Sequence, residues 1–267
     1  MSLLTTPDQL ARRIDEPELR LLDLRPASAF AAGHLPGALH LDLFGVSLRD
    51  TRPAPLAAYE WMIQHLFELR GVDRATSVVV YDETSGMRAA RALWFLRLLG
   101  HPDARLLDGG FERWRRDGRA IVRDGEEREP AVLAVERHPE ILATVDDVIA
   151  AIGRRDVVIV DTRSHAEYTG ALVRAARGGA IPGAIHLEWT RNLGPEGRYL
   201  PADALRAMYA RAGITPEREI ITYCQGGYRA AQSWAALVLA GYPRVRSYLG
   251  SWNEWGNRAD LPIVRPA

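Results

Sequence analysis

Short apolar runs alternate along the chain with longer segments of helical length. Four such runs, bounded by polar residues, lie at 20–24, 77–82, 156–161 and 219–224. Continuous β-branched runs of this kind are typical of buried parallel strands. Segments 88–100 and 229–241 have the length of helices, and each ends at a glycine suited to the position just after a helix. The alternation predicts an α/β fold, with a mainly parallel sheet flanked by helices.

The same pattern occurs twice in the chain. Five blocks recur in one order: LLDLR (21–25) with IVDTR (159–163), LPGALHLDL (35–43) with IPGAIHLEW (181–189), VVVYD (78–82) with IITYC (220–224), MRAARALWFLRLLGHP (87–102) with YRAAQSWAALVLAGYP (228–243), and LLDGGFERW (106–114) with SYLGSWNEW (247–255). Asp23 and Asp161 are 138 residues apart, whereas Pro36 and Pro182 are 146 apart, so the second copy has about eight extra residues around 170–179. We interpret the repeat as a duplicated domain and the extra residues as a surface insertion.

One charged segment, 123–140, contains two prolines and has no counterpart in the repeat. Such a segment is typical of a connection between domains. We therefore predict a first domain at 1–122, a linker at 123–140 and a second domain at 141–267.

The composition, 47% hydrophobic and 25% charged, is that of a globular protein. The 34 basic residues balance 34 acidic ones, which does not indicate a nucleic-acid or membrane surface. The sequence shows neither a secretory signal nor an apolar stretch long enough for a membrane span. Its single cysteine permits no intrachain disulfide, which suits the reducing cytoplasm. We expect a cytoplasmic protein with no nucleic-acid or membrane partner.

Residues that both copies share are interpreted first as structural. The Asp-x-Arg pairs, Asp23 with Arg25 and Asp161 with Arg163, could each be a buried ion pair at a strand end. The other shared positions are expected to be turn glycines, hydrogen-bonded histidines and core tryptophans: Gly37 and Gly183, His40 and His186, Trp114 and Trp255.

The two copies differ in the loop after the third matched block. The first reads DETSGMR (82–88) and the second CQGGYR (224–229), which is one residue shorter and begins with Cys224. Ligands of open α/β sheets bind at the carboxyl ends of the strands. There the loop amides, a helix N-terminus and Arg229 would lower a thiol pKa and bind an anion. We predict that Cys224 is a nucleophile, the alternative being a buried core cysteine.

The first copy lacks the predicted nucleophile. Asp82 stands where the second copy has Cys224, so this loop has no thiol. We also expect the extra residue to aim the amides of this loop differently.

The loop CQGGYR, the paired Asp-x-Arg and IPGAIH blocks and the tail GSWNEWGNRADLP (250–262) resemble the tandem rhodanese family of thiosulfate and 3-mercaptopyruvate sulfurtransferases. The resemblance implies two similar rhodanese domains, of which the first is catalytically silent and the second carries sulfur as a persulfide on Cys224. It also implies that Arg229 helps bind the anionic donor. We expect donor contacts from six residues: Arg163, Gln225, Gly226, Gly227, Tyr228 and Arg229. No metal or organic cofactor is expected, since no Cys/His cluster has ligand spacing.

The sequence departs from many members of that family at Glu167, where they have a second arginine. Glu167 is either a surface glutamate or a functional residue that weakens anion binding. The charged fork of Arg229 favours thiosulfate as donor, with cyanide or a thiol as acceptor. The alternatives are a 3-mercaptopyruvate sulfurtransferase, a cysteine phosphatase or arsenate reductase, and a non-catalytic rhodanese binding module. Only four residues separate Cys224 from Arg229, a loop that is short for binding phosphate, which disfavours a phosphatase. An arsenate reductase would need a second cysteine, and the chain has one cysteine.

Overall fold

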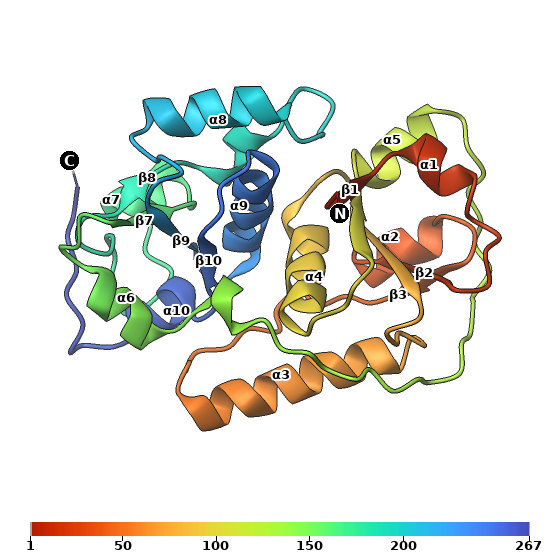
Figure 1. The fold of residues 1–267 in the computed structure, drawn as a ribbon, viewed down its shortest axis with the longest axis horizontal. Coiled ribbons are helices and arrows are strands. Elements are labelled where there is room, and N and C mark those ends of the chain that lie inside the picture. Colours follow the sequence, from red (N-terminus) through yellow and green to blue (C-terminus); the bar gives the residue numbers. More distant parts are fainter. Residues whose placement is uncertain (1, 267) are drawn as a thin grey trace. The chain divides into compact units, whose positions relative to one another are not determined.

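Two five-stranded parallel sheets flanked by helices make up this computed structural model, which describes residues 2–266 (Figure 1). The first sheet has the strand order β1-β5-β4-β2-β3 and the second β6-β10-β9-β7-β8. When the strands are numbered from the start of each copy, the two sheets have the same strand order. The predicted α/β fold, with two similar domains, is confirmed.

The strands of the first sheet are β1 (Leu4–Thr5), β2 (Leu19–Asp23), β3 (Ala38–His40), β4 (Ser77–Tyr81) and β5 (Ala104–Leu107). Those of the second are β6 (Leu142–Ala143), β7 (Val157–Asp161), β8 (Ile185–His186), β9 (Glu219–Tyr223) and β10 (Val245–Tyr248). The central strands β4 and β7 are buried along their whole length, as expected for parallel strands covered on both faces.

The helices of the first half are α1 (Pro7–Ala11), α2 (Ala27–Ala32), α3 (Pro53–Glu68), α4 (Met87–Leu98) and α5 (Gly110–Arg116). Those of the second half are α6 (Val145–Ala151), α7 (His165–Thr169), α8 (Ala202–Arg211), α9 (Tyr228–Leu239) and α10 (Ser251–Trp255), with 3-10 turns at Pro139–Ile141 and Trp189–Asn192. Thr6 and Thr144 open α1 and α6 with the same capping box, so the repeat extends to the helix starts.

The chain divides into two compact units, and each includes one short segment from the other half of the sequence. These two segments are called the exchanged segments. Unit 1 comprises residues 1–46, 59–138 and 193–199, and unit 2 comprises 47–58, 139–192 and 200–267. Within unit 2, the Thr51 amide and hydroxyl each donate to the Glu254 carboxylate at 2.8 Å. Within unit 1, Arg198 donates to Asp108 at 2.8 Å. Each exchanged segment is therefore held by buried or half-buried polar bonds as well as by packing.

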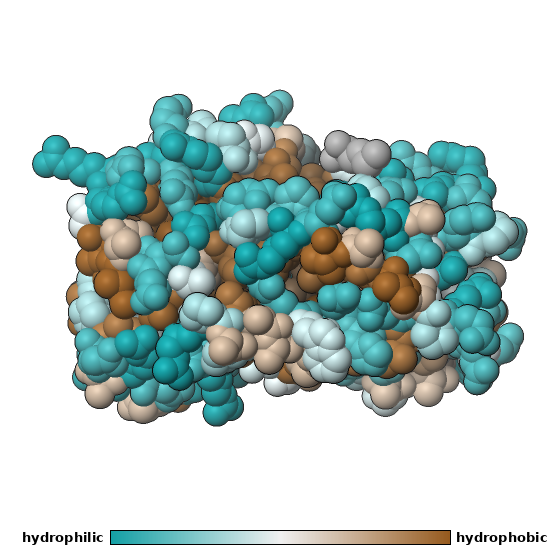
Figure 2. Space-filling model, turned by 60° about the horizontal axis from the view of Figure 1, so that its bottom comes forward, coloured by the Kyte–Doolittle hydropathy of each residue, from teal (hydrophilic) through white to brown (hydrophobic). Residues whose placement is uncertain are grey.

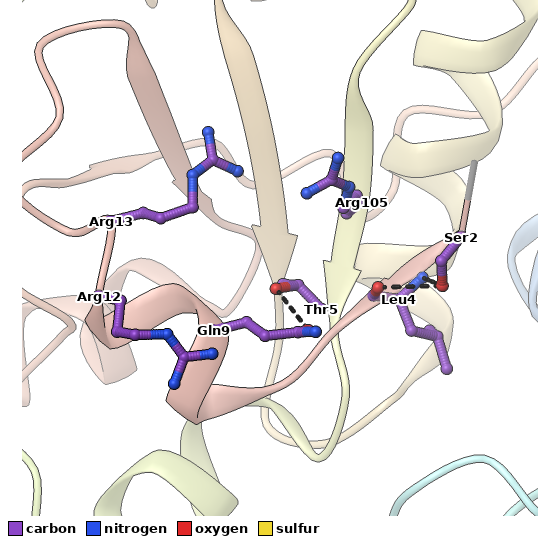
Figure 3. A pocket seen from close by; sticks show the side chains of 7 residues that line it. All are labelled: Ser2, Leu4, Thr5, Gln9, Arg12, Arg13 and Arg105. Atoms are coloured by element: carbon purple, nitrogen blue, oxygen red, sulfur yellow. Dashed lines mark hydrogen bonds between the residues drawn. The ribbon is translucent and has the colours of Figure 1, made fainter.

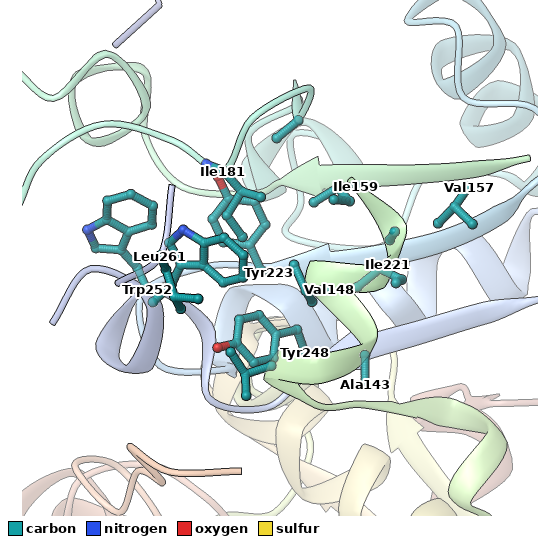
Figure 4. Close-up of a cluster of buried hydrophobic side chains, with 14 residues drawn as sticks. Ala143, Val148, Val157, Ile159, Ile181, Ile221, Tyr223, Tyr248, Trp252 and Leu261 are labelled. Atoms are coloured by element: carbon teal, nitrogen blue, oxygen red, sulfur yellow. Dashed lines mark hydrogen bonds between the residues drawn. The ribbon is translucent and has the colours of Figure 1, made fainter. Parts of the chain in front are cut away.

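One core cluster of unit 2 lies between its sheet and the helices α6 and α10 (Figure 4). Aliphatic side chains of β7 and β9 meet the aromatic rings of Tyr223, Tyr248 and Trp252 there. The Tyr223 hydroxyl donates to Asp161 at 2.6 Å and accepts from the Ile181 amide at 3.2 Å. This buried tyrosine therefore ties the end of β9 to the end of β7.

Hydrophilic side chains cover most of the face in Figure 2, with hydrophobic ones in smaller patches between them. No helix within residues 2–266 has the length and apolar character needed to cross a membrane.

A pocket of about 320 Å³ lies beside β1 and β5 of unit 1, and three arginines line it (Figure 3). Arg13 is paired with Glu16 and Arg105 with Asp103, both at 2.8 Å, and the third is Arg12. None of its lining residues belongs to the loop at 82–88. Because no thiol lines it, we do not assign donor binding to this pocket.

Candidate active site

Cys224 is the first residue after β9, at the carboxyl end of a strand inside the sheet. The loop turns directly into α9 because Gly227, with φ 86°, takes the left-handed conformation that glycine adopts without a clash. The turn after β10 holds this loop, since the Trp252 amide donates to the Cys224 carbonyl at 3.0 Å and the Asn253 amide to the Gln225 carbonyl at 2.8 Å. Cys224 is 1% exposed. Backbone bonds therefore hold the part of the loop that carries the buried sulfur.

Backbone amides converge on the Cys224 sulfur. The Gly227 N–H donates to Sγ at 3.2 Å. Burial raises the pKa of the thiol, but the charge of Arg229 and the amides of Ala230, Gly226 and Gly227 together outweigh it, so the Cys224 pKa lies below its ordinary value. A thiol with a lowered pKa supplies the nucleophilic thiolate near neutral pH.

Arg229 is held by a carboxylate beside the sulfur. Its Nη1 donates to Glu167 Oε2 at 2.6 Å and its Nη2 to Oε1 at 2.9 Å, a two-bond fork. Burial lowers the pKa of Arg229, but Glu167 and the Cys224 sulfur raise it above its ordinary value. The cation is therefore permanent and its direction is fixed.

Glu167 is buried, so its interpretation as a surface glutamate is wrong. It is 2% exposed and also accepts from the Ser164 amide and hydroxyl, with which it forms the capping box of α7. Burial raises its pKa, but Arg229 and Ser164 outweigh burial and hold the pKa at about 2. An anionic donor must therefore share Arg229 with a charged carboxylate.

Arg163 is used within the fold. Its guanidinium donates to Asp161 at 2.5 Å and to the Gly179 carbonyl at 2.7 Å, and it lies 4.4 Å from the ring centroid of Trp252. The residue is 1% exposed. Arg25 of the first copy makes the matching bonds, to Asp23 at 2.6 Å and the Gly33 carbonyl at 2.7 Å. This placement favours the structural interpretation and does not support the prediction that Arg163 binds the donor.

The histidines shared by the two copies make matching bonds too. His40 lies 2.9 Å from the Arg25 carbonyl and His186 lies 2.8 Å from the Arg163 carbonyl. A matching bond in both copies indicates a role in the fold.

The other predicted site residues lie in the loop with Cys224. Gln225 Nε2 donates to Asn253 at 2.7 Å and to the Arg174 carbonyl at 3.1 Å. A Cβ added at Gly226 would lie 2.9 Å from Asn253 Nδ2 and 3.0 Å from Ser47 Oγ, so the loop passes close beneath these two side chains. Tyr228, the first residue of α9, is buried. Asn253 and Ser47 were missed from the sequence, because no pattern marks them as loop contacts.

The first copy also has a cradle of amides, which corrects one expectation. The Asp82 carboxylate accepts four backbone N–H groups at 3.0 to 3.2 Å, from Thr84, Gly86, Arg88 and Ala89. The longer loop therefore still aims its amides at its first side chain. What differs is the cation. Burial raises the pKa of both groups, but at Cys224 the charge of Arg229 lowers the pKa, whereas at Asp82 backbone bonds chiefly oppose burial. Arg88 is held by Asp42 at 2.7 Å and lies over the Phe44 ring.

No cluster of three or more metal-binding side chains occurs within residues 2–266. The chemistry that the Cys224 site can perform with its own groups is nucleophilic attack by a thiolate, with amides and Arg229 beside the developing negative charge.

Solved structures share this fold over nearly the whole chain. A crystal structure of an anaerobic ergothioneine biosynthesis enzyme from Chlorobium limicola, bound to trimethyl histidine, aligns with a TM-score of 0.88 at 24% identity, covering 99% of this chain and 70% of that one. At this identity the likeness concerns the fold alone.

Curated relatives match the sequence from end to end. A thiosulfate sulfurtransferase of Azotobacter vinelandii is 36% identical over 98% of this chain and 97% of its own length. A thiosulfate sulfurtransferase of Pseudomonas aeruginosa is 35% identical over the same shares. A 3-mercaptopyruvate sulfurtransferase of Escherichia coli K12 is 34% identical over 96% of this chain and 95% of its own. The model of the rhodanese-like domain matches twice, at residues 6–117 and 144–258. The chain therefore belongs to the rhodanese-like family and contains two copies of its domain.

Proposed function

We propose that this sulfurtransferase moves sulfane sulfur from thiosulfate to cyanide or a thiol through a persulfide on Cys224. The observation that carries the proposal is the lowered pKa of a buried thiol held among loop amides beside Arg229. Full-length relatives named thiosulfate and 3-mercaptopyruvate sulfurtransferases support the transfer of sulfur.

The reaction has two steps. The Cys224 thiolate attacks the sulfane sulfur of thiosulfate; the S–S bond of the donor breaks, and sulfite leaves with its electron pair. The acceptor then attacks the outer sulfur of the persulfide, giving thiocyanate or a new persulfide and freeing the Cys224 thiolate. The amide of Gly227 and the charge of Arg229 stabilise the negative charge at the sulfur in both steps.

Thiosulfate is the donor that a permanent arginine cation favours, because its dianionic end accepts two bonds from the guanidinium. The Glu167–Arg229 pair favours the second candidate, 3-mercaptopyruvate, because a single carboxylate suffers less repulsion from Glu167. We expect a high KM for thiosulfate rather than a change of donor.

Incubation with thiosulfate should add one sulfur atom, about 32 Da, to the intact protein, and cyanide should remove it. Intact-mass measurement checks this, and a donor panel with cyanide as acceptor compares kcat/KM for thiosulfate and 3-mercaptopyruvate. An unchanged mass with both donors would refute the persulfide. A higher kcat/KM for 3-mercaptopyruvate would leave the persulfide standing and assign the other donor.

The first copy should stay silent even when it is given a thiol. In the variant Asp82→Cys/Cys224→Ser we expect no persulfide and no turnover. The loop amides would face the new sulfur, but Arg88, held by Asp42 and the Phe44 ring, would not place its charge beside it as Arg229 does beside Cys224. Intact-mass measurement after thiosulfate tests this, with Asp82→Cys alone as the control that should carry a single added sulfur. Turnover by the double variant would show that the amides suffice without the arginine.

A further inference from the structure

Ser251 is the one residue other than glycine within 2–266 that has a positive φ, 52°. It is the first residue of α10 and is 0% exposed. Residues with a Cβ rarely adopt this left-handed conformation, because the Cβ crowds the following carbonyl oxygen. Such strain persists where the surroundings require the side chain, and it gathers at functional sites.

The Ser251 hydroxyl is bound at both ends. It donates to the Tyr248 carbonyl at 2.8 Å and accepts from the backbone N–H of Cys224 at 3.2 Å. Since its hydrogen goes to Tyr248, its lone pairs are left for the Cys224 amide. The side chain thus joins the end of β10 to the backbone of the residue that bears the thiol.

The first copy provides an internal control, with Gly110 at the matching position. The strand registers align the copies, since Val78 pairs with Ala104 in the first and Ile220 with Val245 in the second. Gly110 has a φ of 56°, so the matching residue has the same left-handed conformation. The residue before it differs, since Gly109 has a φ of 88° and Gly250 a φ of −65°.

The backbone bonds of this turn are also the same in both copies. The Phe111 amide donates to the Asp82 carbonyl at 2.9 Å, as the Trp252 amide does to the Cys224 carbonyl at 3.0 Å. A Cβ at Gly110 would lie 2.4 Å from the Thr84 carbonyl oxygen, so the first copy has no room for a side chain. The second copy keeps the turn and adds a hydroxyl, and this hydroxyl contacts Cys224.

We propose that Ser251 is a positioning residue of the sulfur-transfer site, whose hydroxyl holds the Cys224 amide so that the sulfur stays among the loop amides and beside Arg229. The inference rests on the proposed role of Cys224. Ser251 touches no substrate and acts through the backbone of the nucleophile. Without the hydroxyl, the Cys224 N–H is left without this acceptor in a site that is 1% exposed, and the residue is held through its carbonyl.

Alkylation by iodoacetamide in the absence of donor tests the inference, because the chain has a single cysteine and the reaction reports on Cys224 alone. Alkylation follows the thiolate fraction, so its rate rises with pH through the thiol pKa. In Ser251→Gly we expect this rise to move to higher pH. At about pH 7 its alkylation rate should then be about one third of the wild-type rate or lower. The kcat/KM for thiosulfate should fall at least as much.

Ser251→Gly separates positioning from stability, because glycine relieves the strained φ and the first copy shows that the turn accepts it. We expect its Tm to stay close to that of the wild type, because the relief of the strained φ offsets the loss of the buried hydrogen bonds of the hydroxyl. Ser251→Ala keeps the strain without the hydroxyl and should show the same altered profile with a lower Tm. Ser233→Ala removes another buried hydroxyl of unit 2, one that accepts from Asn192 at 3.1 Å, and should leave the alkylation profile unchanged.

An unchanged alkylation profile in Ser251→Gly would overturn the inference, as would a profile that shifts equally in Ser233→Ala. Both outcomes leave the persulfide on Cys224 intact. If the wild type is alkylated normally but never gains sulfur from thiosulfate or 3-mercaptopyruvate, the proposed function fails instead. The two failures are therefore distinguishable.

Discussion

Cys224→Ser is expected to abolish sulfur transfer, with kcat/KM for thiosulfate falling by about four orders of magnitude or more. A hydroxyl is far less acidic than a thiol, so the charge of Arg229 and the loop amides cannot make it an alkoxide near neutral pH. An oxygen also cannot carry the sulfane sulfur as a persulfide. Thiocyanate formation from thiosulfate and cyanide measures the loss directly.

The serine variant should fold as the wild type does. Serine is close to cysteine in size, and the backbone bonds that hold residue 224 come from Trp252 and Ser251 and do not involve the sulfur. A Tm within a few degrees of the wild type and the absence of any added sulfur after thiosulfate complete the expectation. Turnover retained by Cys224→Ser would place the chemistry elsewhere and refute the mechanism.

The fold could be read from the sequence wherever an element is long or repeated. The runs that became β2, β4, β7 and β9 are five residues each and buried, so their apolar character marks them. Strands of two residues, such as β1 and β6, pair through the backbone and leave too short a pattern to detect. The exchange of 47–58 and 193–199 between the units depends on contacts across most of the chain, which no local pattern encodes.

The candidate nucleophile could be predicted where one copy differs from the other within a matched block. The loop after β9 differs from its counterpart in length and in its first residue, and this difference pointed to Cys224. Arg229 has Arg88 as its counterpart, so it was predicted from its charge and from the family resemblance. The pairing of Glu167 with Arg229 joins residues 62 apart, so the sequence left the role of Glu167 open. Ser251 opposite Gly110 was visible in the repeat, but its meaning required the backbone conformation.

Arg229→Thr is expected to lower kcat/KM for thiosulfate about thirty- to a hundred-and-fifty-fold, the effect of losing about 2–3 kcal/mol from a charged hydrogen bond in the transition state. The loss should be smaller for 3-mercaptopyruvate, which carries one charge. Steady-state kinetics with both donors measures the difference. Equal losses for the two donors would show that Arg229 acts on the Cys224 thiolate alone and does not select the donor.

Arg229→Thr should also change the stability of the protein, because it leaves the carboxylate of Glu167, 2% exposed, without the cation that holds it through two hydrogen bonds. Only Arg174, 3.6 Å away and half exposed, then remains near it. In the wild type the pKa of Glu167 lies at about 2, below its unfolded value. The folded state therefore gains about 3 kcal/mol above about pH 4.5, and this gain is lost as the pH falls through about 2. In the variant, burial raises the pKa of Glu167, and only the two bonds from Ser164 and the more distant charge of Arg174 oppose it. Urea unfolding should then show a lower free energy at neutral pH and a much smaller loss of stability in acid.

The double variant Glu167→Gln/Arg229→Thr separates the two roles of this ion pair. A neutral amide in place of the buried carboxylate removes the unpaired charge, so the free energy of unfolding at neutral pH should recover most of what Arg229→Thr loses. Turnover with thiosulfate should not recover, because the cation beside Cys224 is still missing. If the double variant regains both stability and kcat/KM, the kinetic loss in Arg229→Thr came from unfolding, and Arg229 has no direct part in binding the donor. If it regains stability alone, the arginine acts on the reaction itself and Glu167 serves to hold it in place.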